Sequence, residues 1–529
     1  MRRPLLLASA LMLSLATLPA TAAPSRSPSR WMEHVRVLAD DNMEGRLTGT
    51  PGYERAAAYV AQQFAKLGVK PAGTDGYMQQ VPLLEQTLDI AASSLALVGP
   101  VGETALALGD TVLPGNRVPQ PPAAFDAPLV FIGYGLHLPE AGYDDFAGLD
   151  LKGKIAVTLA GGPQNISGAL KSHASRAELW PALQRAGAIG LVTVANPNHM
   201  DVPWERQKLF VGSPGMRIAD ATLNDAKSAF LTAAFSPAQA ELLFRASGHR
   251  FADLVALADK GAQLPRFNLN QQLKGRIVAT DRPLSAPNVV GRIPGSDRKL
   301  AGEYVVLTAH LDHLGVGQPV NGDSIYNGAM DNASGIASML ETARNLKREK
   351  PKRSILLVAV TGEERGLLGS RYFANRPTVP ADAIAANINM DMYLPLWPFT
   401  HVTALGAEES TLGPISAAVA QSLGVQQLPD DQPERNLFVR SDQYSFVRTG
   451  VPALALKFAA VSPEEKALQK QWLTDRYHAP QDDLSQPIEP AYAEAFNRYL
   501  DKLILTIANT PERPHWNETS FFKRFTRPQ

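Results

Sequence analysis

The chain has 529 residues, of which 45% are hydrophobic, so it is long enough to form two or more domains with large buried cores. Its 51 lysine and arginine residues balance 51 aspartate and glutamate residues, so the chain has no formal net charge. This balance excludes an overall positive electrostatic field that would attract nucleic acid or an anionic membrane. The chain has no cysteine, which excludes disulfides and thiolate ligands, so any metal site must use His, Asp and Glu.

The first 22 residues have the pattern of a signal peptide. Arg2 and Arg3 precede an apolar stretch, and Ala20 and Ala22 have the spacing that signal peptidase recognises. We expect cleavage after Ala22 and an exported product, either periplasmic or extracellular. An apolar stretch of about 15 residues is too short to span a bilayer comfortably, so no stable membrane insertion is expected after the signal is removed.

The rest of the chain divides into segments that differ in the spacing of apolar residues and in proline content. Residues 49–71 have apolar side chains at helical spacing and predict an amphipathic helix that ends near Gly68. The proline-rich stretch 113–128 is typical of a domain boundary. Residues 126–262 contain short apolar strands and a helix without a cluster of metal-binding side chains, which indicates an inserted module that is not catalytic.

From Asn288 onward, apolar strands alternate with helices. Strands that are apolar on both faces and separated by helices predict an α/β fold with a mostly parallel central sheet flanked by helices. We expect strands at 288–293, 304–310, 354–360, 383–391, 402–406 and 451–458, and helices at 332–350, 364–375, 412–423 and 489–508.

Three neighbouring strands of this sheet end in side chains that can bind metals. The first ends in His310, the second is followed by Glu363 and Glu364, and the third ends in Asp391. Asp331 precedes the helix between the first two strands. Each residue alone has an ordinary explanation, such as a core histidine, a helix cap or an acidic first helical turn. Together they indicate one metal site, because ligand sites lie beyond the carboxyl ends of such strands.

Histidine and carboxylate ligands suit zinc, although manganese and cobalt also fit. Two ions roughly 3.5 to 4 Å apart need a bridging carboxylate, and Asp331 is placed to supply it. In the H-x-D motif, we expect Asp312 to fix the tautomer of His310 through the second ring nitrogen. His313 is interpreted as a packing residue, and His478, in a polar loop, is the candidate for the remaining ligand.

The motifs AHLDHLG, NGAMDNASG, TGEERGLLGS, NINMD and RYHAPQDD together resemble the co-catalytic zinc aminopeptidases of metallopeptidase family twenty-eight. The resemblance covers residues 30–125 and 263–510 as the catalytic domain, including an opening segment, EGRLTGTPGY. The insert at 126–262 looks like a protease-associated domain, a likeness carried by GYDDFAGLDLKGKIAV and RAGAIGLVTV. Residues 511–529 remain as a basic and aromatic tail, which either packs on the catalytic domain or stays mobile.

The resemblance implies two zinc ions per chain. One would be held by His310, Asp331 and Asp391, and the other by Asp331, Glu364 and His478. Glu363 would be the general base that takes a proton from a metal-bridging water and passes it to the leaving amine. Tyr477 would support the oxyanion of the tetrahedral intermediate. The resemblance also implies a cis peptide bond between Asp331 and Asn332.

Two segments bear on the substrate cleft. Residues 440–446 resemble a segment that borders the cleft in the family, so Arg440, Asp442 and Gln443 are candidate cleft residues. Gln443 stands where the family often has a histidine. Residues 461–476 predict an amphipathic helix, which is either a lid over the cleft or surface packing, and a lid is slightly favoured.

The sequence therefore predicts an exported, zinc-dependent aminopeptidase that hydrolyses N-terminal residues from peptides. The alternative is a carboxypeptidase or another amide hydrolase that uses the same di-zinc centre. A non-catalytic binding protein on a peptidase scaffold is disfavoured, because all five expected ligands and the expected base are present. The partners expected are peptide substrates and no nucleic acid, and no feature of the sequence specifies an oligomer.

Overall fold

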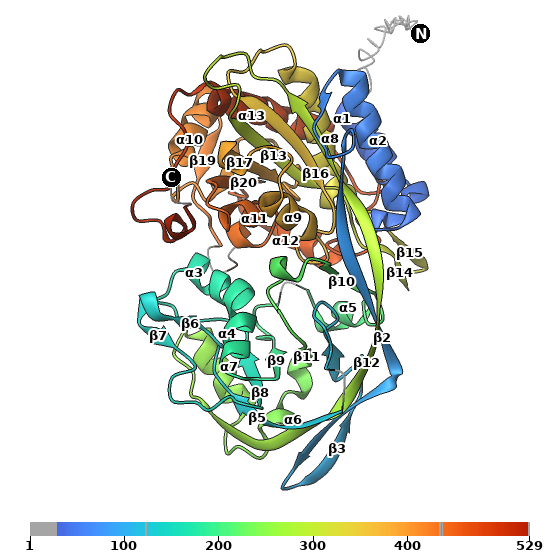
Figure 1. The fold of residues 1–529 in the computed structure, drawn as a ribbon, viewed down its shortest axis with the longest axis vertical. Helices are drawn as coiled ribbons and strands as arrows, with labels where there is room; N and C mark the ends of the chain where they lie inside the picture. The colour runs from blue at the N-terminus through green and yellow to red at the C-terminus, as the bar shows by residue number, and fades with distance from the viewer. Residues whose placement is uncertain (1–28, 122–123, 201, 433–434, 436, 527–529) are drawn as a thin grey trace, which may run out of the picture.

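The computed structural model describes residues 29–121, 124–200, 202–432, 435 and 437–526. Figure 1 shows an upper and a lower lobe, along one side of which two long antiparallel strands run, β2 (Met78–Gly99) and β12 (Phe267–Ile293). The predicted signal peptide lies outside the described residues. Within the described ranges, no helix is both long and apolar enough to cross a membrane.

The upper lobe is built on a sheet with the strand order β19-β18-β20-β17-β13-β16-β12. Four of its six strand pairings are parallel and two are antiparallel. The prediction of a mostly parallel sheet is therefore confirmed. The strands are β13 (Tyr304–His310), β16 (Ser354–Val360), β17 (Ile384–Met390), β18 (His401–Leu405), β19 (Gln426–Leu428) and β20 (Ala453–Phe458).

Helices cover both faces of this sheet, as Figure 1 shows. In β13, Val305 and Leu307 face one hydrophobic cluster, and Tyr304 and Val306 face another. This alternation explains why the strand is apolar at every position. The first face is covered by α1 (Arg30–Leu38), α2 (Pro51–Leu67), α8 (Ser334–Leu346), α10 (Leu412–Ser422) and α13 (Pro490–Asn509), and the second by α9 (Leu368–Asn375) and α11 (Gln443–Val447).

The first long helix forms for reasons that the sequence makes clear. The Thr50 side chain caps the N-terminus of α2 by accepting from Tyr53 N–H, and Gly68 ends it with a left-handed φ of 74°. By contrast, α9 begins at Leu368 rather than at the predicted 364. The residues in between form a turn in which Gly366 has a φ of 113°, so the two glutamates precede the helix instead of forming its first turn.

The lower lobe contains a second run of parallel strands, β5 (Phe125–Phe131), β8 (Ile155–Leu159), β9 (Gly190–Val194) and β11 (Leu231–Phe235). It also contains β3 (Gly102–Leu106), β4 (Val112–Pro114), α3 (Gly168–His173), α4 (Leu179–Arg185), α5 (Trp204–Lys208), α6 (Glu241–Phe244) and α7 (Phe251–Asp259). Its core includes Leu95, Leu97 and Leu273, which lie outside the predicted insert at 126–262. The lobe thus takes in parts of both flanking strands, β2 and β12.

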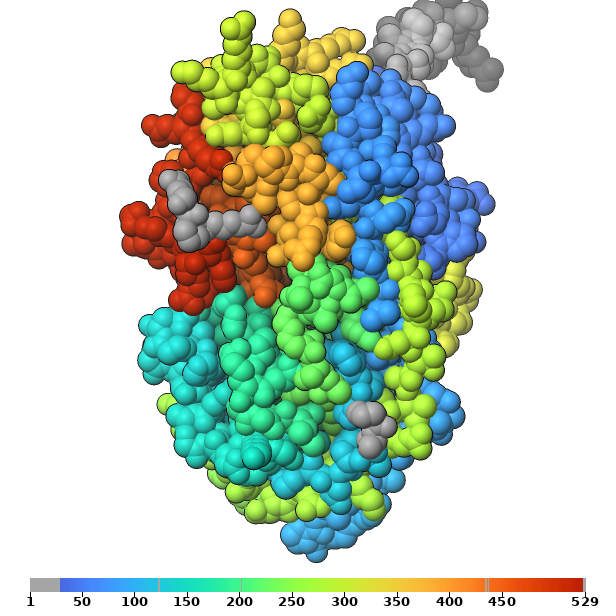
Figure 2. Space-filling view, viewed as in Figure 1, coloured from blue at the N-terminus to red at the C-terminus, as the bar shows by residue number. Residues whose placement is uncertain are grey.

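One segment of the predicted insert belongs structurally to the upper lobe. Residues 215–227, here called the arm, include β10 (Gly215–Ile218), which pairs with β2. Met216 and Ile218 are buried in the upper core. In Figure 2 the green surface of the arm lies against the orange surface around residue 370. Asp225 forms ion pairs with both Arg371 and Arg448 at 3.0 Å, and these contacts bind the arm to the upper lobe.

The described part of the C-terminal tail packs onto both lobes. Phe522 is fully buried in a cluster that contains Phe438 of the upper lobe and Ala177 of the lower one. The Trp516 ring nitrogen donates to the carbonyl of Gly450 at 3.0 Å. Of the two possibilities that the sequence left open for the tail, packing is therefore the one that holds over residues 511–526.

Candidate metal centre and catalytic pocket

The predicted ligands meet because neighbouring parallel strands end at one edge of the sheet. His310 is the last residue of β13 and pairs in register with Val360, the last residue of β16. Glu363 and Glu364 follow β16, and Asp391 follows β17, which lies on the other side of β13. The sheet therefore brings these side chains to a common rim, as the sequence predicts.

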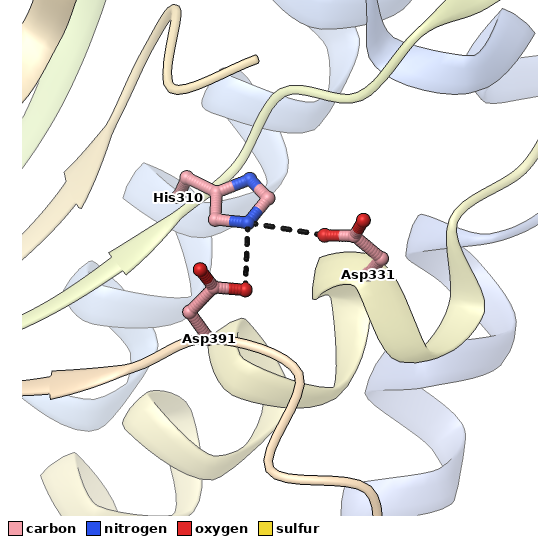
Figure 3. A group of neighbouring side chains, drawn as sticks. All are labelled: His310, Asp331 and Asp391. Carbon is pink, nitrogen blue, oxygen red and sulfur yellow. Dashed lines mark hydrogen bonds and ion pairs between the residues drawn. The ribbon is translucent and has the colours of Figure 1, made fainter. Parts of the chain in front are cut away.

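The first cluster is formed by His310, Asp331 and Asp391, drawn in Figure 3. The Nε2 atom of His310 lies 3.2 Å from an oxygen of Asp331 and 3.4 Å from an oxygen of Asp391. Asp331 comes from the turn Ala329–Ala333 that precedes α8, and the peptide bond between Asp331 and Asn332 is cis, as expected.

A second cluster lies on the other side of Asp331. The Nε2 atom of His478 is 3.4 Å from Asp331 Oδ2 and 3.1 Å from Glu364 Oε2. His310 faces the other oxygen, Oδ1, of the same aspartate. Asp331 thus presents one oxygen to each cluster, which is the arrangement that a bridging ligand requires.

The structure corrects the interpretation of His313 as a packing residue. Its Nδ1 atom lies 2.8 Å from Glu364 Oε1, and the side chain is fully buried beside Asp331. A histidine that holds one carboxylate oxygen leaves the other, Oε2, directed at His478. His313 therefore orients Glu364, and His313, Asp331 and Glu364 form a second group of potential ligands.

The prediction that the carboxylate of Asp312 fixes the tautomer of His310 is wrong, because a different atom of Asp312 makes the contact. The Nδ1–H of His310 donates to the backbone carbonyl of Asp312 at 3.1 Å, not to its carboxylate. This bond still leaves Nε2 facing Asp331 and Asp391, where a neutral ring would offer its lone pair to a metal. The carboxylate of Asp312 instead accepts from the backbone N–H groups of Glu363 and Glu364, at 3.1 and 3.3 Å, and so fixes the turn that carries both glutamates.

The two adjacent glutamates have different electrostatic surroundings. Burial raises the pKa of Glu363 well above its ordinary value, although His310 opposes this. Burial acts on Glu364 in the same direction, but His478 and His313 hold the pKa of Glu364 well below its usual range. One carboxylate is therefore kept ionised as a ligand, and its neighbour is suited to carry a proton.

The donor set fits two divalent cations. Burial lowers the pKa of His478, but Glu364 and Asp331 raise it to about 10, because several carboxylates share this enclosed site. Divalent cations would supply the positive charge that these carboxylates attract, and histidine nitrogen with carboxylate oxygen is a ligand set suited to zinc. His310, Asp331 and Asp391 would hold one ion, and Asp331, Glu364 and His478 the other.

Two buried groups that the sequence analysis did not single out support the ligand-bearing loops. Arg46 is fully buried and donates to the carbonyls of Leu311, Asn327 and Gly328 at 2.8, 2.6 and 3.0 Å. It lies in the EGRLTGT motif, so the resemblance of that motif was the available signal. Asp482 accepts from the backbone N–H of Asp331 at 2.9 Å and from that of the residue before it.

A pocket of about 210 Å³ opens over the clusters. Among the predicted site residues it is lined by Asp331, Glu363, Glu364, Asp391, Arg440, Gln443, Tyr477 and His478. Asp442 lies outside the lining and is fully buried, and burial raises its pKa to about 7. The side-chain amide nitrogen of Gln443 donates to the carbonyl of Phe438 at 2.7 Å, and its oxygen accepts from the side-chain nitrogen of Asn389 at 2.8 Å.

Other lining residues were missed by sequence reasoning. Lys457 donates to the carbonyls of Asp391 and Met392, and the signal for it was a lysine inside the otherwise apolar strand ALALKF. Arg117 and Arg176 also line the pocket. Both lie far from the motifs, and Arg176 belongs to the lower lobe, so no sequence pattern placed them here.

The helix predicted at 461–476 is present as α12 (Pro463–Asp475), which begins with a capping box formed by Ser462 and Glu465. Its Leu473 lines the pocket, and Trp472 is buried. Arg206 of α5 donates to the carbonyls of Thr474 and Tyr477 at 2.5 and 2.9 Å, so the lower lobe holds the end of this helix. A lid role for α12 stays a prediction.

Parts of the chain are similar to known proteins. Residues 288–504 match the model of Peptidase family M28. A probable zinc metalloprotease of Pyrenophora tritici-repentis is 36% identical over 110 residues, which are 21% of this chain and 22% of that protein. A probable leucine aminopeptidase of Aspergillus fumigatus is 29% identical over 255 residues, which are 45% of this chain and 47% of that protein. The match thus spans less than half the length of either relative.

A solved structure shares the fold. An aminopeptidase from Aneurinibacillus sp. strain AM-1 superposes with a TM-score of 0.52 and 19% sequence identity, over 92% of this chain and 94% of that one. The mixed α/β architecture with a large central sheet flanked by helices is therefore shared with that structure.

Proposed function

Because the chain contains a Peptidase family M28 domain, we propose that it is a zinc-dependent aminopeptidase with two zinc ions. The observation that carries the proposal is the position of Asp331, whose two oxygens face two separate histidine-containing clusters beside Glu363. The relatives named as a zinc metalloprotease and as aminopeptidases support the metal and the substrate class. Export is part of the proposal and rests on the N-terminal sequence alone.

Zinc bound here would lower the pKa of a water molecule and polarise the peptide carbonyl. Glu363 lines the pocket beside both clusters, so with the ions bound its carboxylate would be placed to accept a proton from the attacking water and to return it to the leaving amine. Tyr477 lines the same pocket, and burial raises the pKa of its hydroxyl well above the ordinary value. The hydroxyl therefore stays protonated and donates to the oxyanion.

The proposal is tested with leucine p-nitroanilide and its N-acetylated form, each before and after chelation and after zinc is returned. We expect cleavage of the free-amine compound only, abolished by the chelator and restored by zinc. Chelator-sensitive cleavage of the acetylated compound would contradict an aminopeptidase and would favour another amide hydrolase with the same centre. It would not indicate a carboxypeptidase, because the compound has no C-terminal carboxylate.

The variant Glu363→Gln tests the assigned base. It keeps the size of the side chain and removes its ability to accept a proton, so kcat should fall by about 100-fold or more. The metal content should stay at that of the unmodified protein, because Glu363 is not assigned as a ligand. Near-normal turnover in a zinc-loaded variant would show that another group is the base.

A further inference from the structure

The catalytic pocket has two ends of different chemistry. At one end, the apolar residues Met392, Leu405, Leu437 and Leu473 lie beside Arg435 and Lys457, and this wall continues into a small neighbouring cavity. At the other end, the pocket meets a chamber of about 840 Å³ between the lobes, and Arg176 and Arg440 line both spaces. A substrate that extends from the metal centre towards the chamber therefore passes arginine side chains.

The charges of the pocket are not balanced by the metal-binding residues alone. Four acidic side chains line it, and two divalent cations would neutralise them. The lining also includes five basic side chains, which are Arg117, Arg176, Arg435, Arg440 and Lys457. With the metals proposed above, the charges of Arg117 and Arg176 are not offset by a further acidic side chain that lines the pocket, which favours an anionic substrate group.

Arg117 and Arg176 are the two arginines best suited to bind such a group. Arg117 donates to the backbone carbonyl of Glu364 at 2.8 Å, and it forms no ion pair with an acidic side chain among the described residues. Arg176 has no hydrogen-bond or ion-pair partner among the residues that the structure describes. Both side chains are exposed to the cavity. Partial loss of water around each guanidinium inside the pocket lowers the pKa of both arginines to about 10, so both remain charged at neutral pH.

We propose that Arg176, with Arg117 beside it, binds a carboxylate of the substrate, so that the enzyme prefers short peptides with a carboxylate just beyond the bond that is cleaved. The carboxylate is either the C-terminus of a dipeptide or an acidic side chain. The planar guanidinium matches a carboxylate with two parallel hydrogen bonds. An apolar N-terminal side chain would then lie at the other end, against Met392 and Leu473. This inference rests on the proposed function and specifies its substrates.

Binding is measured first, in a form that does not depend on turnover. Zinc-loaded Glu363→Gln protein is titrated calorimetrically with Leu-Gly and with Leu-Gly-amide, and then with Leu-Asp-amide and Leu-Asn-amide. We expect the member of at least one pair that carries the carboxylate to bind at least tenfold more tightly, and the responding pair identifies the source of the carboxylate. Adding Arg176→Gln should abolish the difference, and Arg176→Lys should restore part of it.

The matched control is Arg185→Gln, which removes an exposed arginine of the same lobe that does not line the pocket. It should leave the tenfold preference intact. Equal affinities for both members of both pairs would overturn the inference, as would a preference that survives Arg176→Gln.

Steady-state kinetics of the wild-type protein with the same peptides separate the two hypotheses. Cleavage of the amides and carboxylates at equal kcat/KM would leave the aminopeptidase intact and overturn the inference. Preferential binding without cleavage of any free-amine peptide would overturn the aminopeptidase and support the carboxylate site. Arg176→Gln should act mainly on KM, because a group that binds the substrate away from the reacting atoms contributes equally to ground state and transition state.

Discussion

At the scale of single residues, the site is built by giving similar side chains different surroundings. Glu363 and Glu364 are adjacent, yet only Glu364 contacts His313 and His478. Asp312 and Asp482 bind backbone N–H groups instead of facing the clusters, so they fix the loops that carry the ligands. These supporting carboxylates should matter for metal affinity nearly as much as the ligands.

Asp482→Ala should weaken zinc binding about 10- to 100-fold, because it leaves the N–H groups of Met330 and Asp331 buried without an acceptor and frees the loop of the bridging ligand. Competition with a chromophoric chelator measures the affinity. Asp483→Ala is the control, since its carboxylate accepts only from Ser485 among the described residues. Equal zinc affinity in the two variants would contradict the role given to Asp482.

Asp145 of the lower lobe should make stability depend on pH. It is fully buried, and burial raises its pKa from 3.8 to about 6 although Leu136 N–H bonds its carboxylate. The folded state therefore binds the proton of the Asp145 carboxyl more tightly than the unfolded state does. The protonated carboxyl stabilises the folded state by about 3 kcal/mol, the free energy that corresponds to the pKa difference between 3.8 and about 6. This stabilisation is complete below pH 3.8 and is lost as the pH rises through about 6.

Asp145→Asn keeps an acceptor and stays neutral, so its stability relative to the wild type should increase between pH 4 and pH 7. Denaturant titrations at several pH values give this difference. Asp126→Asn, at an exposed position of β5, should show no such trend. A constant difference between Asp145→Asn and the wild type across the range would refute the assignment.

At the scale of elements, the pocket depends on contacts between segments of different lobes. Tyr477 and His478 lie in the loop after α12, and Arg206 of α5 in the lower lobe donates to the carbonyls of Thr474 and Tyr477. The arm and the described part of the tail add further contacts between the two parts of the chain. The lower lobe therefore helps to position side chains that are proposed to be catalytic, and it also lines the chamber.

Arg206→Met should loosen the 474–478 segment, because the carbonyls of Thr474 and Tyr477 lose their donor. We expect faster amide hydrogen exchange in peptides that cover this segment and a several-fold lower kcat, with little change in exchange elsewhere. Lys208→Met on the same helix is the control, because Lys208 pairs with Asp110 and Glu205 instead. Unchanged exchange at 474–478 would show that Arg206 does not hold the segment.

At the scale of the whole molecule, metal binding should be coupled to folding. The clusters join residues from β13, from the turns before α8 and α9, and from the loop after α12, so bound zinc would tie together distant parts of the upper lobe. It would also relieve repulsion among buried carboxylates. A ligand that binds only the folded state stabilises it in proportion to its affinity.

Removing zinc with a chelator should therefore lower the free energy of unfolding, by about 4 kcal/mol if free zinc was 1,000-fold above its dissociation constant. Differential scanning calorimetry before chelation, after it and after zinc return gives the shift in Tm. The wild-type lower lobe offers an internal control, since its described residues contain no group of three potential ligands. An unchanged Tm of the upper lobe would mean that the clusters do not bind zinc tightly.

Much of the upper lobe could be predicted from the sequence. The strands and helices are local consequences of apolar periodicity and of caps such as Thr50 and Gly68, which the chain encodes within a few residues. The late start of α9 was missed because the left-handed turn at Gly366 and Leu367 competes with the helical preference of the glutamates. The extent of the lower lobe was also missed, since strands β2 and β12 run continuously through both lobes.

The sequence by itself determined the chemistry of the site, because the residue types and their positions at strand ends specify a ligand set of histidine and carboxylate. Only the tertiary structure decided which atoms face one another. It assigned the carbonyl of Asp312, the ring of His313 and the buried Arg46 to the support of the loops, and it brought Arg117 and Arg176 to the pocket from distant segments. Such contacts depend on the packing of whole elements and lobes, which no local pattern records.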